Sequence, residues 1–192
     1  MTWRTHLVGG IASLWPLALL PGGLAGTPAG SGGVGVLAAV AAFGALLPDL
    51  DAAESKIKSL SLGDGARDWG MRPFALPAVL LHRHFGHRGA LHSLLALGVL
   101  VLLTLPLSLR LGWQAQMALS LGYSSHLLLD ACTPRGVPLL WPDRRARHAL
   151  PRSFRIPTGS PEEGLVFALL ANLAVLLLLS KLLQRTFSTG VL

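Results

Sequence analysis

The sequence predicts an all-α polytopic membrane helix bundle with about five transmembrane helices and additional interfacial helices. Three observations predict this class. Hydrophobic residues make up 52% of the 192 residues. Charged residues make up only 13%, against roughly 25% in an average soluble domain. The apolar residues also gather in runs that approach the roughly 17–25 residues needed to cross hydrocarbon. The length favours one integral membrane domain over residues 1–192.

Five apolar segments are the predicted spanning helices. In chain order they are Leu7–Leu24, Gly33–Leu47, Ala90–Leu109, Gly112–Ala131 and Gly164–Leu183. The uncharged linker between the first two segments is rich in Gly and Pro, which predicts a tight helical hairpin.

The segments differ in character. The first contains Pro16 and Pro21, and we expect it to be a retained helix rather than a cleaved signal peptide. The fourth carries His126 and Asp130 inside a run of leucines. The fifth is the most uniformly apolar, and Lys181 near its end can extend its ammonium group to the interface.

The positions of the basic residues predict the orientation. With a cytoplasmic N-terminus, 13 of the 16 Lys and Arg residues fall on the cytoplasmic side and three, Arg110, Lys181 and Arg185, on the other. Basic residues favour the cytoplasmic side of membrane proteins. We therefore expect a multi-pass protein of the inner (plasma) membrane with its N-terminus in the cytoplasm.

Two long cytoplasmic stretches connect the segments. Within residues 51–89, the run FALPAVLLHRHF at 74–85 is predicted to be an interfacial amphipathic segment. Residues 139–161, rich in Arg, Pro and Trp, are expected to lie along the lipid head groups.

The net charge of +7 does not indicate nucleic-acid binding. In a membrane protein the excess of basic residues is explained by orientation and by attraction to anionic lipids. We expect membrane lipids as partners and no nucleic acid, and the sequence does not indicate an oligomeric state. A single cysteine, Cys132, excludes an internal disulfide and is interpreted as a small buried apolar residue.

Every predicted helix brings a His, Asp or Glu to the cytoplasmic face. In order of segments these residues are His6; Asp49 and Asp51; His87 and His92; His126 and Asp130; and Glu162 and Glu163. Ionisable groups are costly in lipid, at roughly 2.5–3.5 kcal/mol each near the bilayer centre. A shared divalent metal offsets that cost, since imidazole nitrogen and carboxylate oxygen are ligands of zinc.

The spacing suggests how these residues reach one site. His126 and Asp130 lie one helical turn apart on the same face and can bind one ion. His87 and His92 are about 140° apart on an ideal helix, so His87 is expected in the turn before the helix. Pro48 disfavours helical geometry at Leu47, which predicts an irregular segment for the two aspartates that follow.

Each residue also has a simpler interpretation. Asp49 could be a helix cap. Glu162 or Glu163 could be first-turn acids favoured by the helix dipole, and Ser160 with Glu163 forms a capping box. Convergence from five helices, and not any single residue, carries the metal-site prediction.

The motifs LPDLD, HRGALHS, SHLLLDACTPRGVPLLWP and TGSPEE occur in an order and spacing that resemble the YdjM-like family. These are LexA-regulated, membrane-bound, metal-dependent hydrolases of bacteria and archaea. The resemblance covers nearly the whole chain. The family is in turn similar to the zinc-dependent phospholipase C and single-strand nuclease superfamily, which implies phosphoester hydrolysis.

The resemblance implies a ligand set of His6, Asp49 or Asp51, His87 or His92, and His126 with Asp130. Only one His-x-x-x-Asp/Glu pair is present, which favours one or two metal ions over three. The implied metal is zinc, with manganese as an alternative. The expected substrate is a phospholipid or other lipid-linked phosphate at the cytoplasmic face.

In this interpretation the metal lowers the pKa of a bound water and so makes hydroxide available. Asp51 or Glu163 would serve as base, and Arg88 or Arg135 would hold the phosphate. For each Arg, membrane topology and lipid attraction are the simpler explanation.

Two other functions are compatible with the sequence. One is a non-catalytic membrane scaffold with a structural metal, which would be closed by four protein ligands. The other is a metal or proton transporter, which needs polar groups along the membrane depth. The outer halves of three segments lack such groups, whereas the fourth carries Gln114 and Gln116.

Overall fold

The structure is a computed structural model, and it describes residues 1–20, 32–51 and 89–188. The described part of the chain is helical. Its helices are α1 (Trp3–Ala12), α2 (Trp15–Leu19), α3 (Gly32–Leu46), α5 (Leu94–Leu111), α6 (Trp113–Ala131) and α7 (Pro161–Ser188). Short 3-10 turns are η1 (Leu47–Asp51), η3 (Ala90–His92) and η4 (Arg152–Phe154). No strand is formed within these ranges, which confirms the all-helical prediction.

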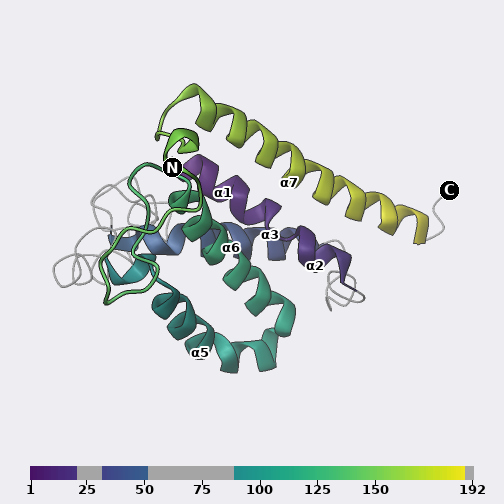
Figure 1. Ribbon diagram of the computed structural model, residues 1–192. Helices are drawn as coiled ribbons and strands as arrows, with labels where there is room; N and C mark the ends of the chain where they lie inside the picture. Colours follow the sequence, from purple (N-terminus) through teal and green to yellow (C-terminus); the bar gives the residue numbers. More distant parts are fainter. Residues whose placement is uncertain (21–31, 52–88, 189–192) are drawn as a thin grey trace, which may run out of the picture.

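Helices α3 and α6 form the centre of the bundle, with α1 and α7 on one side and α5 on the other (Figure 1). Their backbones touch because small residues face each other. A Cβ at Gly122 would lie 2.0 Å from the Ala41 carbonyl oxygen, and one at Gly44 would lie 2.3 Å from that of Leu119. Small residues permit such close helix packing in membranes.

The first predicted segment is not one helix. It divides into α1 and α2, with the break at Ser13 and Leu14, so the prediction of a continuous helix from Leu7 is wrong. Pro16 explains the break, since proline has no N–H and its ring clashes with the carbonyl four residues earlier. The prediction that α3 ends before Pro48 is confirmed, because α3 stops at Leu46 and η1 follows.

Helices α5 and α6 form a hairpin around Gly112, whose φ of 86° is readily adopted only by glycine. The Gln116 side-chain amide donates to the Val101 carbonyl at 2.8 Å and ties the two helices together. Helix α5 begins at Leu94 and not at Ala90, because the Ser93 hydroxyl caps it by accepting from the Ala96 N–H at 3.2 Å.

Helix α7 extends beyond its predicted bounds at both ends. It packs against α1 and contacts α2, where the Trp15 indole donates to the Leu173 carbonyl at 2.9 Å. Lys181, predicted to extend to the interface, contacts the Ala18 carbonyl at 3.4 Å and the Gln184 side chain at 3.0 Å.

Residues 132–160 form an irregular arm between α6 and α7. It is held by a two-way backbone pair between Val137 and Arg147 and by the Leu94 N–H, which donates to the Leu139 carbonyl at 2.9 Å. The predicted interfacial segment at 74–85 lies outside the described residues.

Two helical stretches among the described residues are long and apolar enough to cross a membrane, Gly33–Leu50 and Pro161–Lys181. The apolar run of α5, Leu94–Pro106, is shorter. The expected five spans and the orientation of the N-terminus therefore stay predictions.

Candidate metal centre

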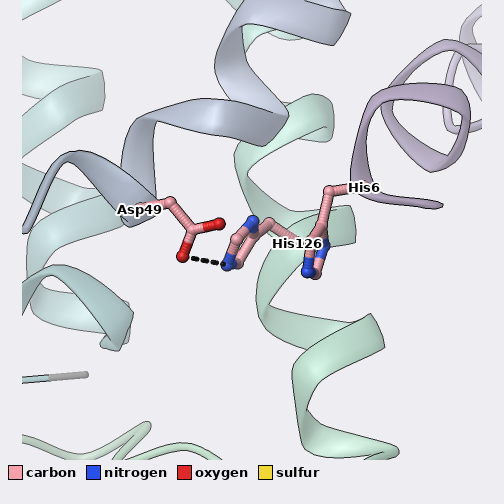
Figure 2. Close-up of side chains that lie close together, drawn as sticks. All are labelled: His6, Asp49 and His126. Atoms are coloured by element: carbon pink, nitrogen blue, oxygen red, sulfur yellow. Dashed lines mark ion pairs between the residues drawn. The ribbon is translucent and has the colours of Figure 1, made fainter. Parts of the chain in front are cut away.

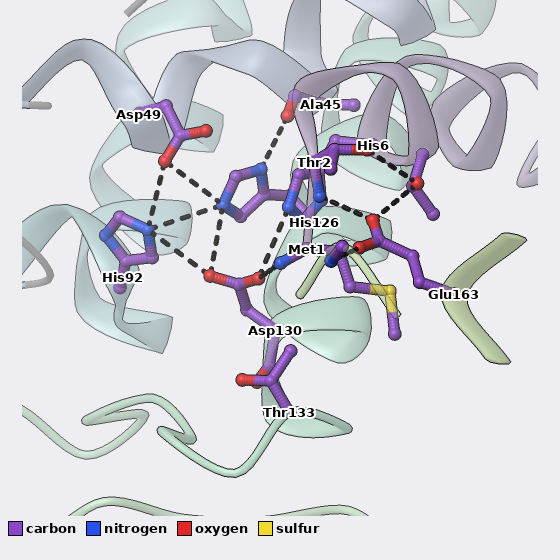
Figure 3. Close-up of polar contacts among 12 residues, drawn as sticks. Met1, Thr2, His6, Ala45, Asp49, His92, His126, Asp130, Thr133 and Glu163 are labelled. Carbon is purple, nitrogen blue, oxygen red and sulfur yellow. Dashed lines mark hydrogen bonds and ion pairs between the residues drawn. The ribbon is translucent and has the colours of Figure 1, made fainter. Parts of the chain in front are cut away.

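Five of the predicted metal-ligand residues meet at one end of the bundle. His6 comes from α1, Asp49 from η1, His92 from η3, and His126 and Asp130 from α6 (Figure 3). The three imidazoles and Asp130 are fully buried, whereas the Asp49 side chain is 25% exposed. The cluster is therefore closed by protein on most sides and most open at Asp49.

His126 lies at the centre of the cluster. Its Nδ1 donates to the Ala45 carbonyl at 2.7 Å, which leaves Nε2 with a lone pair directed at the other residues. Ala45 is in the last turn of α3, where carbonyls lack partners within the helix. The end of α3 thus fixes both the tautomer and the orientation of His126, as backbone carbonyls commonly do for metal-binding histidines.

Two groups of three residues, which share His126, could each hold an ion: His92, His126 and Asp130, and His6, Asp49 and His126. The Nε2 atoms of His92 and His126 have two carboxylate oxygens as neighbours, Oδ1 of Asp49 and Oδ2 of Asp130 (Figure 3). The two nitrogens are 3.3 Å apart. Asp49 Oδ1 lies 3.6 Å from His92 Nε2 and 3.8 Å from His126 Nε2. Asp130 Oδ2 lies 3.9 Å and 3.8 Å from the same two atoms.

These separations fit a metal site. Tetrahedral zinc with bonds of roughly 2.1 Å has ligands that are roughly 3.4 Å apart. The Nε2 atoms of His92 and His126 and Oδ2 of Asp130 lie 3.3, 3.8 and 3.9 Å from one another, slightly farther apart than three corners of such a tetrahedron. Two imidazoles and a carboxylate are a donor set that zinc accepts. Asp49 belongs to a second possible group, with His6 and His126. The residues present could hold one divalent cation with little rearrangement.

The other oxygen of Asp130 faces a different group. Oδ1 lies 3.3 Å from His6 Nε2 and 2.5 Å from the Met1 backbone nitrogen. The His6 ring stacks on the His126 ring with centroids 3.8 Å apart (Figure 2 shows both rings and Asp49). Among the described residues, no group is hydrogen-bonded to the buried His6 Nδ1. Asp130 therefore links His92 and His126 to His6 and could bridge two ions.

His92 is held by contacts that the sequence pattern did not indicate. It lies in the short turn η3, whereas the predicted segment Ala90–Leu109 had placed it on a helix. The Tyr123 hydroxyl of α6 donates to the Leu91 carbonyl, and the Ser93 hydroxyl donates to the Ala90 carbonyl at 2.5 Å. A tyrosine one turn before His126 is the signal that could have suggested this tie.

Glu163 is buried, whereas Glu162 is exposed. The Oε1 atom of Glu163 accepts from the Thr2 N–H at 2.5 Å and from the Thr5 hydroxyl at 2.7 Å. Its Oε2 accepts from the Gly159 N–H at 2.6 Å. The predicted capping box is half formed, because the Glu163 N–H donates to the Ser160 hydroxyl at 3.3 Å while the carboxylate turns to other donors. Glu163 thus joins the start of α7 to the turn of α1 that carries His6.

The remaining predicted site residues are not placed in the cluster. His87 and Arg88 lie outside the described residues, and so does the side chain of Asp51. Arg135 is exposed on the arm after α6. Cys132, interpreted from the sequence as a small buried apolar residue, is only half-buried at the end of α6, and burial raises the pKa of its thiol.

Residues 1–188 match the protein family described as YdjM inner membrane protein. The chain is 42% identical over 123 residues to the inner membrane protein YdjM of Escherichia coli (strain K12), and the match covers 62% of this chain and 52% of that protein. The same values hold for YdjM of Shigella flexneri. The chain thus spans about half the length of these two relatives.

A further relative covers more of both chains. The uncharacterized protein YvsG of Bacillus subtilis (strain 168) is 34% identical over 171 residues, which are 88% of each chain. No solved structure matches the chain.

Proposed function

The chain belongs to the YdjM family of inner membrane proteins, and from that premise we propose that it is a metal-dependent phosphoester hydrolase. The proposed substrate is a phospholipid or another lipid-linked phosphate at the cytoplasmic face of the inner membrane. The proposal includes the five-span, multi-pass topology with a cytoplasmic N-terminus.

One observation carries the proposal: the Nε2 atoms of His92 and His126 and one oxygen of Asp130 have nearly the mutual spacing of ligands in a tetrahedral metal site. The nitrogens of His92 and His126 are 3.3 Å apart in a buried place. Because His126 Nδ1 donates to the Ala45 carbonyl, His126 Nε2 offers a lone pair there, which can accept a hydrogen bond from His92 Nε2 or bind a cation placed between the two rings. Buried charges are otherwise costly unless they are paired or bound to metal.

His92, His126 and Asp130 would hold the first ion, zinc or else manganese, and His6 with Asp49 would support a second. A bound ion would supply Lewis acidity and a water of lowered pKa. Asp49 is the most exposed residue of the cluster, so the substrate phosphate would approach from its side.

The protein's own residues would supply the remaining roles. Asp51 lies in the same turn as Asp49 and is one candidate for the base that accepts the proton of the attacking water. Glu163 is the other candidate, although its carboxylate already accepts hydrogen bonds from α1 and from Gly159. Arg88, four residues before His92 in the sequence, would hold the phosphate.

A structural metal in a scaffold is the second candidate function. It is favoured by the burial of His92, His126 and Asp130, since a structural zinc site has no position open to water or substrate. Transport is less well supported. No His, Asp or Glu occurs in α3, in α5 or in α6 before His126, and the Gln116 amide is engaged with Val101.

Hydrolysis of defined lipids tests the proposal. Detergent-purified protein loaded with Zn²⁺ or Mn²⁺ would be mixed with phosphatidic acid or phosphatidylglycerol in micelles, and the products would be followed by mass spectrometry. We expect release of phosphate or of the phosphorylated head group by the wild type, and its loss in His126→Ala. Ser125→Ala, which removes a hydroxyl that contacts only the Gly122 carbonyl of its own helix, is the control. A folded, metal-loaded protein that cleaves none of these lipids would favour the structural metal.

A further inference from the structure

An apolar groove adjoins the candidate metal centre. Its volume is about 380 Å³, which is in the range of pockets that hold small ligands, roughly 300–1,000 Å³. The walls come from η1, η3, α5, α6 and the arm, and every lining side chain is aliphatic or aromatic. Representative lining residues are Leu47, Leu91, Val99, Tyr123 and Trp141.

The groove and the metal centre share their supporting elements. Leu47 and Leu50 lie on either side of Asp49 in η1. Leu91 directly precedes His92 in η3, and its carbonyl accepts from the Tyr123 hydroxyl. One end of the groove is therefore built by the same turns that place Asp49 and His92.

From this end the groove follows α5. Its lining includes Leu95, Val99 and Leu103, which are successive residues on one face of that helix. At 1.5 Å per residue, the stretch from Leu95 to Leu103 extends for roughly 12 Å. The three side chains are about half exposed or more, so the groove is open along its length.

The lining of the groove indicates which class of ligand it can bind. Among the described residues of its lining, no side chain carries a charge or an amide. The polar atoms there are the Tyr123 hydroxyl, which donates to the Leu91 carbonyl, and the Trp141 indole nitrogen, so hydrogen bonding contributes little to recognition in the groove. In a membrane protein, an elongated apolar groove with an exposed lining can contact the hydrocarbon chains of lipids. A charged cluster at one end and an apolar groove leading from it match a phosphate head group attached to a hydrocarbon tail.

We propose that this groove binds one acyl chain of the lipid whose phosphate lies at the metal centre. The inference rests on the proposed function and narrows its substrate class to phospholipids with long tails, to the exclusion of water-soluble phosphoesters. Leu100 and Trp141 in the lining set how the tail fits.

Native mass spectrometry of the full chain in detergent tests the proposal. The probe is phosphatidic acid with long acyl chains, compared with the same head group on short acyl chains. We expect one long-chain lipid bound per protein and at least about tenfold weaker binding of the short-chain lipid, since each buried methylene contributes about 0.8 kcal/mol. This comparison uses the wild type alone and does not depend on the folding of any variant.

A matched pair of variants locates the bound tail. Leu100→Trp fills the groove, whereas Leu102→Trp places the same side chain two residues away on the exposed face of α5, outside the lining. We expect Leu100→Trp to weaken long-chain binding at least about tenfold and Leu102→Trp to leave it unchanged. Equal binding of long and short chains, or equal binding by both variants, would overturn the proposal.

Failure of the groove and failure of the hydrolase give different results. If the groove is right and the hydrolase is wrong, long-chain lipid binds in a Leu100-dependent manner but is not cleaved. If the hydrolase is right and the groove is wrong, lipids of both chain lengths are cleaved equally well and Leu100→Trp has no effect.

Discussion

Helix α6 carries two adjacent regions of opposite character. Near its middle, Gly122 packs directly against the backbone of α3 at Ala41, in a region of small residues without ionisable side chains. One turn later, His126 and Asp130 belong to a buried polar cluster. In the first region, small residues allow α3 and α6 to pack closely. The second region depends on this close packing, because the Ala45 carbonyl of α3 can lie 2.7 Å from His126 Nδ1 only when the two helices are this near to each other. The precision of the polar site thus depends on the apolar crossing beside it.

The largest effect is expected from enlarging a residue at the crossing. Gly122→Ala places a methyl group against the Ala41 carbonyl, and we expect a loss of stability of about 1–3 kcal/mol or more, since a packed core resists added volume. Thermal unfolding in detergent measures it. Metal content should fall as well, because α3 and Ala45 are displaced from His126.

Gly98→Ala is the control for this prediction. Gly98 is an exposed helical residue with no atom within 4 Å of an added Cβ. Alanine should raise stability there by about 0.5–1 kcal/mol, since glycine is the poorer helix former. If both substitutions changed stability in the same direction, the close crossing of α3 and α6 would be refuted.

A smaller loss is expected where the polar region is tied to α7. Glu163→Ala removes the acceptor of three hydrogen bonds and leaves the Thr2 and Gly159 N–H groups and the Thr5 hydroxyl without it. Hydrogen bonds to charged groups contribute about 1.5–3 kcal/mol each, so we expect a loss of about 2 kcal/mol or more in chemical denaturation. The exposed neighbour Glu162 serves as control: Glu162→Ala should change stability by less than about 0.5 kcal/mol.

The capping of α5 should have a more modest effect. Ser93→Ala removes the hydroxyl that accepts from the Ala96 N–H and that donates to the Ala90 carbonyl beside His92. We expect a loss of about 1 kcal/mol, the usual contribution of an N-cap serine, together with a weaker affinity for metal. Ser108→Ala near the other end of α5 removes a hydroxyl bonded only to the Leu105 carbonyl and should leave metal affinity unchanged.

The smallest effect is expected at the cysteine. Cys132 is not among the residues grouped around the metal centre, although it follows Asp130 by two positions. Cys132→Ala should therefore keep the full metal content, measured by elemental analysis, and change stability by about 0.5 kcal/mol or less. Loss of metal in this variant would make the thiol a ligand and revise the donor set.

The sequence allowed the cluster to be predicted because its members are easily recognised. His and Asp residues stand out in apolar segments, and the fold brings the ends of the helices that carry them together at one end of the bundle. Pro48 likewise signalled the end of α3. What could not be predicted depends on backbone geometry: the Ala45 carbonyl that orients His126 and the turn that holds His92.

The two roles of Glu163 show the same limit. The sequence indicates both a capping box and a catalytic base at Glu163. The hydrogen bonds of Glu163 with Thr2 and Thr5 could not be predicted, because they depend on where α1 lies in the fold. The apolar groove is a further case. Its lining comes from five separate elements, and no one of them has a pattern that distinguishes groove residues from residues that face lipid.

The metal content of the detergent-purified protein tests the central claim most directly. Wild type would be compared with a His126→Ala, Asp130→Ala double variant after equal loading with Zn²⁺ or Mn²⁺. The account predicts one or two ions per wild-type chain and almost none in a folded double variant, with Cys132→Ala retaining the wild-type value. A folded wild type that binds no metal after loading would contradict it, and the five converging residues would then be a buried polar network without an ion.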